Sequence, residues 1–308
     1  MSIIGPQEPQ TAPERTILAK IFLSSEEARL RAGWRIAAHS IAYNILLICI
    51  GLPITLLIMF AGMDYQSLWL SQALNIVALT VTIFLARRFL DRRSITSLGL
   101  KLDGWMVADL LMGIFITFVM MGLIYFIMSA AGWLTFEGFA WEIDSPGVVW
   151  GGALTFFVTF ILVGWNEELL FRGYRLQNIS AGLNPIWAVL ISSAWFGAAH
   201  LLNPNANFIS TLGIFLAGLF LAYPYLRTRQ LWLSIGLHIG WNFFEGVVFG
   251  FPVSGLEIYP LTRIQIHGPE LWTGGAFGPE AGFVLLPALL IGAALIYVYT
   301  RARKAEFD

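Results

Sequence analysis

Three short polar clusters, in an otherwise apolar chain, consist of residue types that can carry out hydrolysis. In chain order they contain Glu167, Glu168 and Arg172, then His200, then His238 and Asn242. Carboxylates and imidazoles are the usual general acids and bases of enzymes, and they are also common zinc ligands. A joint reaction requires a fold that brings the three clusters together.

The first cluster separates into a pair and a single acid. Adjacent helical residues point about 100° apart, so Glu167 and Glu168 serve different faces. Glu168 and Arg172 are i, i+4 neighbours and are expected to form an ion pair. Glu167 then has no local partner and is free for acid–base work. The alternative is that both acids are snorkelling residues at a helix end.

The other two clusters each have a functional and a structural interpretation. His200 follows Phe196 at i+4, and the Gly-Ala-Ala run between them also suits a helix-packing face. His238 and Asn242 share one helix face, and Glu245 continues it without an assigned role. Stacked hydrogen-bonding side chains suit metal ligation or stabilisation of an oxyanion, and equally suit polar contacts between helices.

Composition places these clusters in a membrane. Of the 308 residues, 57% are hydrophobic and only 12% are charged, whereas soluble domains have about 25% charged residues. The aromatic content excludes disorder. A net charge of −1 gives no basic excess for nucleic acid, which we exclude as a partner. Cys49 is the single cysteine, which excludes an intrachain disulfide and a cysteine-based metal cluster.

Eight apolar runs reach about the 18 residues needed to cross the hydrocarbon core. They cover residues 36–60, 68–86, 110–134, 147–165, 185–202, 208–226, 231–249 and 282–300. Their lack of period-2 alternation favours helices over a β-barrel. The predicted fold class is therefore an all-α polytopic membrane protein with about eight transmembrane helices and a bilayer around it.

Basic residues set the predicted orientation. With the N-terminus inside, all of the 18 Lys and Arg residues except Arg263 fall in cytoplasmic segments, as the positive-inside rule requires. Both termini are then cytoplasmic. The outer loops are expected to hold the acids Asp64, Glu137, Glu142, Asp144, Glu257, Glu270 and Glu280.

Three segments follow from this topology. Residues 1–35 are predicted to be a polar cytoplasmic segment with a surface helix running from Ser24 into Arg35. Residues 36–300 are the eight-helix transmembrane domain, and residues 301–308 are a basic cytoplasmic tail.

Helix depth predicts that the clusters can meet. Glu167 lies about 14 residues before the turn near residues 180–184 and His200 about 16 after it, so both are roughly 21–24 Å from that turn. His238 and Asn242 lie about 10 and 16 Å from the start of their helix at Leu231. The depths agree only if the hairpin of the fourth and fifth predicted helices extends several ångströms further into the cytoplasm. The predicted site is therefore within the membrane and nearer its cytoplasmic side.

The ordered motifs Glu-Glu-x-x-x-Arg, Phe-x-x-x-His and His-x-x-x-Asn resemble those of the CPBP family. This family includes the type II CAAX prenyl proteases, bacteriocin-processing enzymes and Abi proteins. The resemblance covers about residues 94–300. The extended form Glu-Glu-Leu-Leu-Phe-Arg-Gly-Tyr and the run Gly274–Gly278 resemble the bacterial branch. The resemblance implies an intramembrane endopeptidase of a bacterial plasma membrane, acting on a membrane-associated or lipid-modified peptide or protein, prenylated in one branch.

The resemblance also implies roles for the residues. Glu167 and His200 would activate the attacking water, while His238 and Asn242 would hold the oxyanion. Glu168 and Arg172 would support them. A metal-free mechanism is favoured over zinc held by Glu167, His200 and His238, because His-Glu-x-x-His is absent and Asn242 is a poor zinc ligand. The alternatives from other classes are a non-catalytic immunity or regulatory membrane protein, and a transporter with a proton relay.

Overall fold

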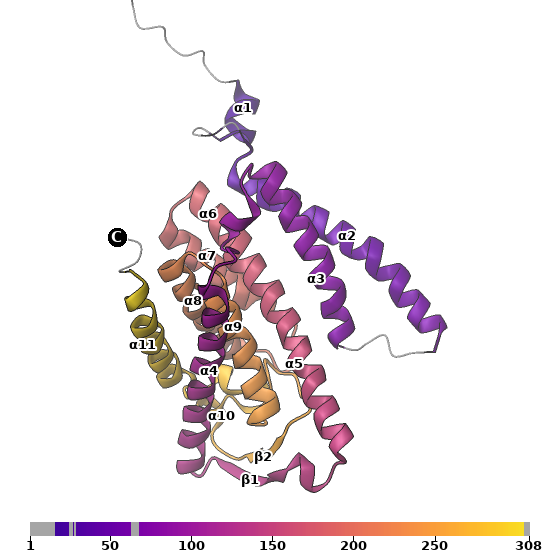
Figure 1. The fold of residues 1–308 in the computed structure, drawn as a ribbon, viewed down its shortest axis with the longest axis vertical. Coiled ribbons are helices and arrows are strands. Elements are labelled where there is room, and N and C mark those ends of the chain that lie inside the picture. The colour runs from indigo at the N-terminus through magenta and orange to yellow at the C-terminus, as the bar shows by residue number, and fades with distance from the viewer. Residues whose placement is uncertain (1–15, 25–26, 28, 63–67, 305–308) are drawn as a thin grey trace, which may run out of the picture.

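The structure, a computed structural model, describes residues 16–24, 27, 29–62 and 68–304 and consists mainly of long helices (Figure 1). The α-helices are α1 (Ile17–Phe22), α2 (Ala32–Phe60), α3 (Leu68–Leu85), α4 (Trp105–Ala130), α5 (Pro146–Glu168), α6 (Leu176–Gly182), α7 (Pro185–Ala199), α8 (Phe208–Thr228), α9 (Trp232–Asn242), α10 (Glu270–Thr273) and α11 (Leu285–Lys304). π-Helical segments η1 (Ala86–Leu90), η4 (Leu169–Arg175) and η5 (Phe243–Val248) continue α3, α5 and α9. Short 3₁₀ segments are η2 (Ile95–Leu98), η3 (Ala140–Glu142), η6 (Gly275–Phe277) and η7 (Pro279–Ala281).

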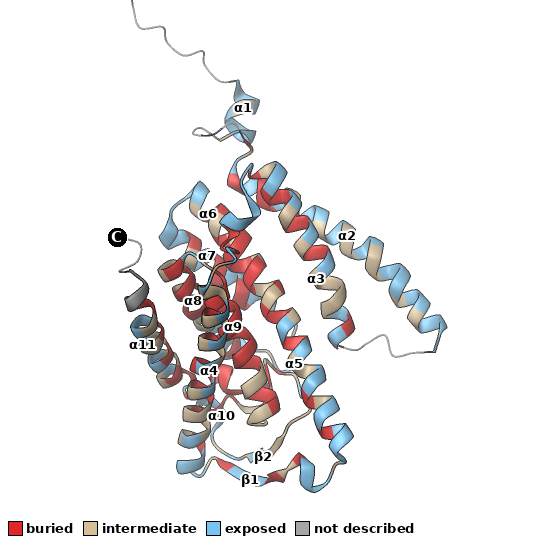
Figure 2. Cartoon of the chain, viewed as in Figure 1, coloured by how far each residue is buried: buried red, intermediate tan, exposed pale blue. Residues whose placement is uncertain are grey.

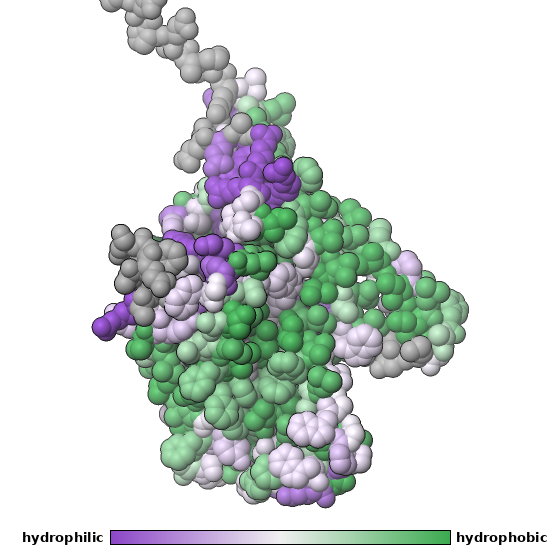
Figure 3. Space-filling view, viewed as in Figure 1, coloured by the Kyte–Doolittle hydropathy of each residue, from purple (hydrophilic) through white to green (hydrophobic). Residues whose placement is uncertain are grey.

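Five helical stretches in the described part of the chain are long and apolar enough to cross a membrane. They are Ala32–Phe60, Leu68–Leu90, Trp105–Ala130, Pro146–Gly182 and Phe208–Thr228. Figure 2 shows that most of α2 is exposed or only partly buried, and Figure 3 shows a broad apolar surface around the helices. Such a surface is stable only in contact with lipid, so the chain is a helical membrane protein.

The remaining three predicted spans are helical but shorter. Residues 185–202 contain α7, which has 15 residues and stops before His200. Residues 231–249 contain α9 with η5, and residues 282–300 contain most of α11. Every residue of α9 is buried because α9 is surrounded by the other helices and does not face lipid (Figure 2). The count of eight spans therefore stays a prediction.

The described residues of the predicted surface helix from Ser24 into Arg35 do not form one helix, and residues 25, 26 and 28 lie outside the described residues. The helix of this region is α1, whose Thr16 side chain accepts a hydrogen bond from the Ala19 amide. Leu23 and Leu30 instead pair as an antiparallel bridge, and α2 begins only at Ala32. The Arg29 side chain turns inward to donate to a backbone carbonyl at 2.8 Å, which favours the bridge over a helix there.

A small sheet modifies the all-α prediction. Strands β1 (Leu134–Phe139) and β2 (Thr262–Ile266) pair antiparallel at the end of the molecule opposite α1 (Figure 1). The register shifts next to Gly138, whose φ of +134° is strained for any residue with a side chain. Period-2 patterning over so few residues gives a weak signal beside long apolar helices, so these residues are easily predicted as plain loop.

Helix α9 lies against α4 with almost no side chain between the two backbones. A Cβ atom added at Gly236 would lie 2.9 Å from the Cα of Leu110. One added at Gly240 would lie 2.8 Å from the Cα of Ile114, and one at Gly113 would lie 2.7 Å from the Leu233 carbonyl. Small residues permit this approach, as is common between membrane helices. The approach fixes the position of the helix that carries His238.

Gly236→Ala is predicted to destabilise the protein. The new methyl group meets backbone, which cannot rotate away, so α4 and α9 must separate at a cost of about 1–3 kcal/mol. Thermal unfolding of the detergent-solubilised protein measures the effect. The matched control is Gly151→Ala on α5, where nothing lies within 4 Å of the added Cβ. Equal unfolding temperatures for the two variants would contradict this account of the packing.

Candidate active site

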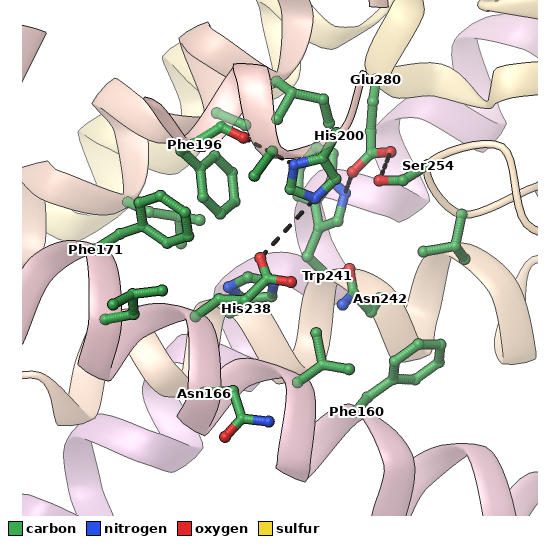
Figure 4. Close-up of a pocket in the computed structure, with 18 of the residues that line it drawn as sticks. Phe160, Asn166, Phe171, Phe196, His200, His238, Trp241, Asn242, Ser254 and Glu280 are labelled. Atoms are coloured by element: carbon green, nitrogen blue, oxygen red, sulfur yellow. Dashed lines mark hydrogen bonds and ion pairs between the residues drawn. The ribbon is translucent and has the colours of Figure 1, made fainter. Parts of the chain in front are cut away.

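The fold brings all three polar clusters to one cavity. Glu167 and Glu168 end α5, Arg172 lies on η4, His200 directly follows α7, and His238 and Asn242 lie on α9. Figure 4 shows the histidines, Asn242 and Trp241 converging from these separate elements. The predicted meeting of residues far apart in the sequence is therefore observed.

Two imidazoles face the Glu167 carboxylate. Glu167 Oε2 lies 3.7 Å from His238 Nε2 and 3.9 Å from His200 Nε2, which agrees with the expectation that these residues share one depth. Both separations exceed a direct hydrogen bond. Glu167 Oε2 is buried and has no hydrogen-bond partner among the described residues. A water molecule beside these three atoms can contact all of them.

The second ring nitrogen of each histidine is already occupied. His200 Nδ1 lies 2.8 Å from the Phe196 carbonyl oxygen, and a carbonyl only accepts, so this nitrogen donates. His238 Nδ1 lies 2.8 Å from Glu168 Oε1 and donates in the same way. In the neutral imidazoles the Nε2 atoms therefore carry the lone pairs and can take up a proton.

The predicted pair of Glu168 and Arg172 is present and fully buried. Arg172 donates to Glu168 Oε1 at 2.7 Å and to the Gly218 carbonyl oxygen at 3.1 Å. Its guanidinium also lies 4.4 Å from the centre of the Phe196 ring. Glu168 Oε1 thus joins Arg172 to His238, and this contact orients the imidazole, as expected of a supporting residue.

Asn242 lines the same cavity one helical turn beyond His238. The cavity has a volume of about 420 Å³, and its polar groups lie among apolar side chains such as Phe160 and Leu237 (Figure 4). An amide next to an imidazole that has taken up a proton presents two donors to one point, which suits an oxyanion.

Sequence reasoning missed Glu280, which was expected in an outer loop. It is only 4% exposed, lines the cavity, and accepts hydrogen bonds from the Trp241 indole at 3.1 Å and the Ser254 hydroxyl at 2.6 Å. The preceding Gly274 and Gly278 have positive φ, which lets short turns fold η7 back into the bundle. The glycine run Gly274–Gly278 was the signal in the sequence that could have indicated these turns and the burial of Glu280.

Glu245, whose role was left open, is also completely buried. Neither of its carboxyl oxygens has a hydrogen-bond partner in the described part of the chain. It lies beside Gly278, whose added Cβ would be 3.4 Å from Glu245 Oε1. The face that it shares with His238 therefore continues into the glycine-rich turns below the cavity.

The side chains suggested as zinc ligands do not form a ready metal site. Within the described ranges, no group of three or more His, Cys, Asp and Glu side chains has a geometry that could hold a metal ion. The two Nε2 atoms face a single carboxylate oxygen, and Asn242 completes the ring of polar groups.

Arg172→Met is predicted to destabilise the protein by about 3–5 kcal/mol, because it leaves the Glu168 charge buried without its cation. Adding Glu168→Gln removes that charge and should restore part of the loss. Thermal unfolding in detergent measures both variants. Arg88→Met, at an exposed arginine, is the control. If Arg172→Met were as stable as this control, the Glu168–Arg172 pair would contribute nothing to the stability of the protein.

Comparison with known proteins finds a similarity in the central part of the chain. No match was found among curated protein sequences. Residues 149–244 match the family model of the type II CAAX prenyl endopeptidase Rce1-like proteins. This range includes all three polar clusters, from Glu167 to Asn242. Over residues 149–244 the chain is therefore similar to the Rce1-like type II CAAX prenyl endopeptidases, which is consistent with the resemblance to the CPBP family.

Proposed function

We propose that the protein is an intramembrane endopeptidase in which Glu167 and His200 activate a water molecule. The observation that carries the proposal is the Glu167 carboxylate facing the Nε2 atoms of two histidines inside one cavity. An ionisable cluster at membrane depth is costly and is retained for function. The match to an endopeptidase family supports peptide hydrolysis over other reactions.

The reaction begins with proton transfer to Glu167. As the carboxylate takes a proton from water, the resulting hydroxide attacks the carbonyl carbon of the scissile bond. The oxygen of that carbonyl becomes negatively charged. Protonated His238, held by Glu168, donates to it from Nε2, and the Asn242 amide donates beside it. Glu168 holds the His238 ring in place before the charge develops, so this donor needs little reorganisation.

Collapse of the tetrahedral intermediate completes the hydrolysis. The C–N bond breaks, and the leaving nitrogen needs the proton that water gave up. His200 Nε2 is 3.9 Å from Glu167 Oε2 and can pass that proton from the carboxyl group to the amine. The products are a carboxylic acid and a free amine, and the site returns to its starting protonation state.

The cavity favours a substrate that reaches it from the membrane. Its apolar lining suits a membrane-associated or lipid-modified peptide, and the family description supports a prenylated one. We further propose eight spans with both termini in the cytoplasm. The α1 end of the molecule is hydrophilic (Figure 3) and includes Arg35, Arg87 and Arg93, whereas Arg263 lies on β2 at the opposite end. This distribution of basic residues supports the proposed orientation and a site on the cytoplasmic side. The motif extensions support a bacterial plasma membrane.

Glu167→Gln is predicted to abolish cleavage while leaving the fold intact. The amide keeps the shape of the side chain but cannot accept a proton, so a loss of about 10³-fold or more is expected. Cleavage of a farnesylated CAAX peptide by the purified protein is the measurement. The matched control is Glu257→Gln, an exposed glutamate outside the cavity. A Glu167→Gln variant with normal cleavage would end the catalytic proposal and favour a non-catalytic regulatory or immunity role.

The mechanism is proposed to need no metal. Protein purified after chelator treatment should retain full cleavage activity and contain far less than one zinc per chain by elemental analysis. Activity that falls on chelation and returns with zinc would contradict the metal-free mechanism. Glu167, His200 and His238 would then be the ligands to test by substitution.

A further inference from the structure

Arg175 lines the same cavity as Glu167, and we propose that it binds the C-terminal carboxylate of the substrate peptide. The inference rests on the proposed function, since it takes the occupant of the cavity to be a peptide. It assigns a binding residue and a chain direction, and it gives Arg175 no part in the chemistry.

The buried arginines near this site have acidic partners, unlike the partly buried Arg175. Arg172 is paired with Glu168, and Arg35 and Arg87 are both paired with Asp91. Arg175 has no ion pair with any carboxylate in the described part of the chain, and its Nε is buried without a hydrogen-bond acceptor. A guanidinium has five N–H donors, so this cation is left to bind an acceptor from outside the protein.

Two aromatic rings hold the guanidinium in place. Its central carbon lies 4.2 Å from the centre of the Trp195 ring on α7 and 4.9 Å from that of Phe171 on η4. Such contacts stabilise the charge but satisfy none of its N–H groups. A positioned cation with free donors is the arrangement that binds carboxylates with two parallel hydrogen bonds.

The neighbouring polar residues supply donors and no negative charge. Tyr43 on α2 donates to Asn75 Oδ1 on α3 at 2.6 Å, and both residues line the cavity with Arg175. That bond occupies the Asn75 carbonyl and leaves its NH₂ group as a donor. One positive charge with neutral donors matches the single charge of a carboxylate better than a phosphate dianion.

The position of Arg175 lets one peptide reach both residues. It lies eight residues beyond Glu167 on the continuous helix of α5 and η4, which is at most about 12 Å, because a π-helical turn rises less than the 1.5 Å per residue of an α-helix. Both side chains line one continuous cavity. A peptide with its carboxylate on Arg175 therefore runs with its C-terminus toward α6 and its scissile bond at Glu167.

Binding to the inactive Glu167→Gln protein tests the inference apart from cleavage. The probes are a farnesylated CAAX peptide with a free C-terminus and the same peptide with a C-terminal amide, in neutral detergent, followed by fluorescence anisotropy. The acid form should bind about 10- to 100-fold more tightly, as expected for a charge-assisted hydrogen bond. Arg175→Gln should remove that preference, and Arg175→Lys should reduce it.

Arg227→Gln is the matched control. Arg227 also lies over an aromatic ring, 5.1 Å from the centre of Tyr297, but donates to Thr300 and does not line the cavity. It should keep the full preference for the acid. Unfolding temperatures of all the variants identify any that fail to fold. If Arg175→Gln fails to fold, Arg175→Lys still tests the pair of hydrogen bonds from the guanidinium to the carboxylate.

Several results would overturn the inference. They are equal affinity for acid and amide, a preference that survives Arg175→Gln, and no binding of either peptide. Arg175-dependent retention of phosphatidylglycerol without an acid preference would reassign the residue to a lipid headgroup. Wild-type protein that cleaves both forms equally well would refute the role of Arg175 while the protease stands. Cleavage of neither form would count against the protease itself.

Discussion

The site depends on one carboxylate that two hydrogen-bond donors share. Glu168 Oε1 accepts from Arg172 at 2.7 Å and from His238 at 2.8 Å, and all three side chains are buried. Buried charges are costly unless they are paired and hydrogen-bonded. This constraint joins α5 and η4 to α9, and the Arg172 bond to the Gly218 carbonyl adds α8. The Glu168 carboxylate therefore both holds together the helices around the cavity and orients the His238 imidazole.

The pair of adjacent glutamates shows how one helix separates structure from chemistry. Glu168 faces the protein interior and is 0% exposed, whereas Glu167 faces the cavity. Because successive residues point about 100° apart, the same turn can anchor the bundle with one carboxylate and keep the other free. The close backbone contact between α4 and α9 completes this arrangement, since it leaves His238 little freedom to move away from Glu167.

Much of the fold and site could be predicted from the sequence because the governing signals are local. Apolar length gave the helices, and i, i+4 spacing gave the Glu168–Arg172 pair. Depth counting placed Glu167 level with His200, and the two lie within 3.9 Å. Glu280 could not be placed in this way. Its burial depends on short glycine-rich turns that fold back into the bundle, which no period in the sequence reports. The β1–β2 sheet and the bridge at Leu23 depend likewise on pairing between distant or turn-constrained segments.

The π-helical segment η4 has a consequence for how this site can change. A π-helical turn holds about one residue more than an α-helical turn, and η4 lies between Glu167 and α6. A regular α-helix through the same residues would rotate everything that follows by about 100° relative to α5. Arg175 would then leave the cavity wall while Glu167 kept its place. The wide turn of η4 therefore sets the side of the helix on which the proposed chain-end site lies, and a substitution that removed this turn would separate the binding of a chain end from the chemistry.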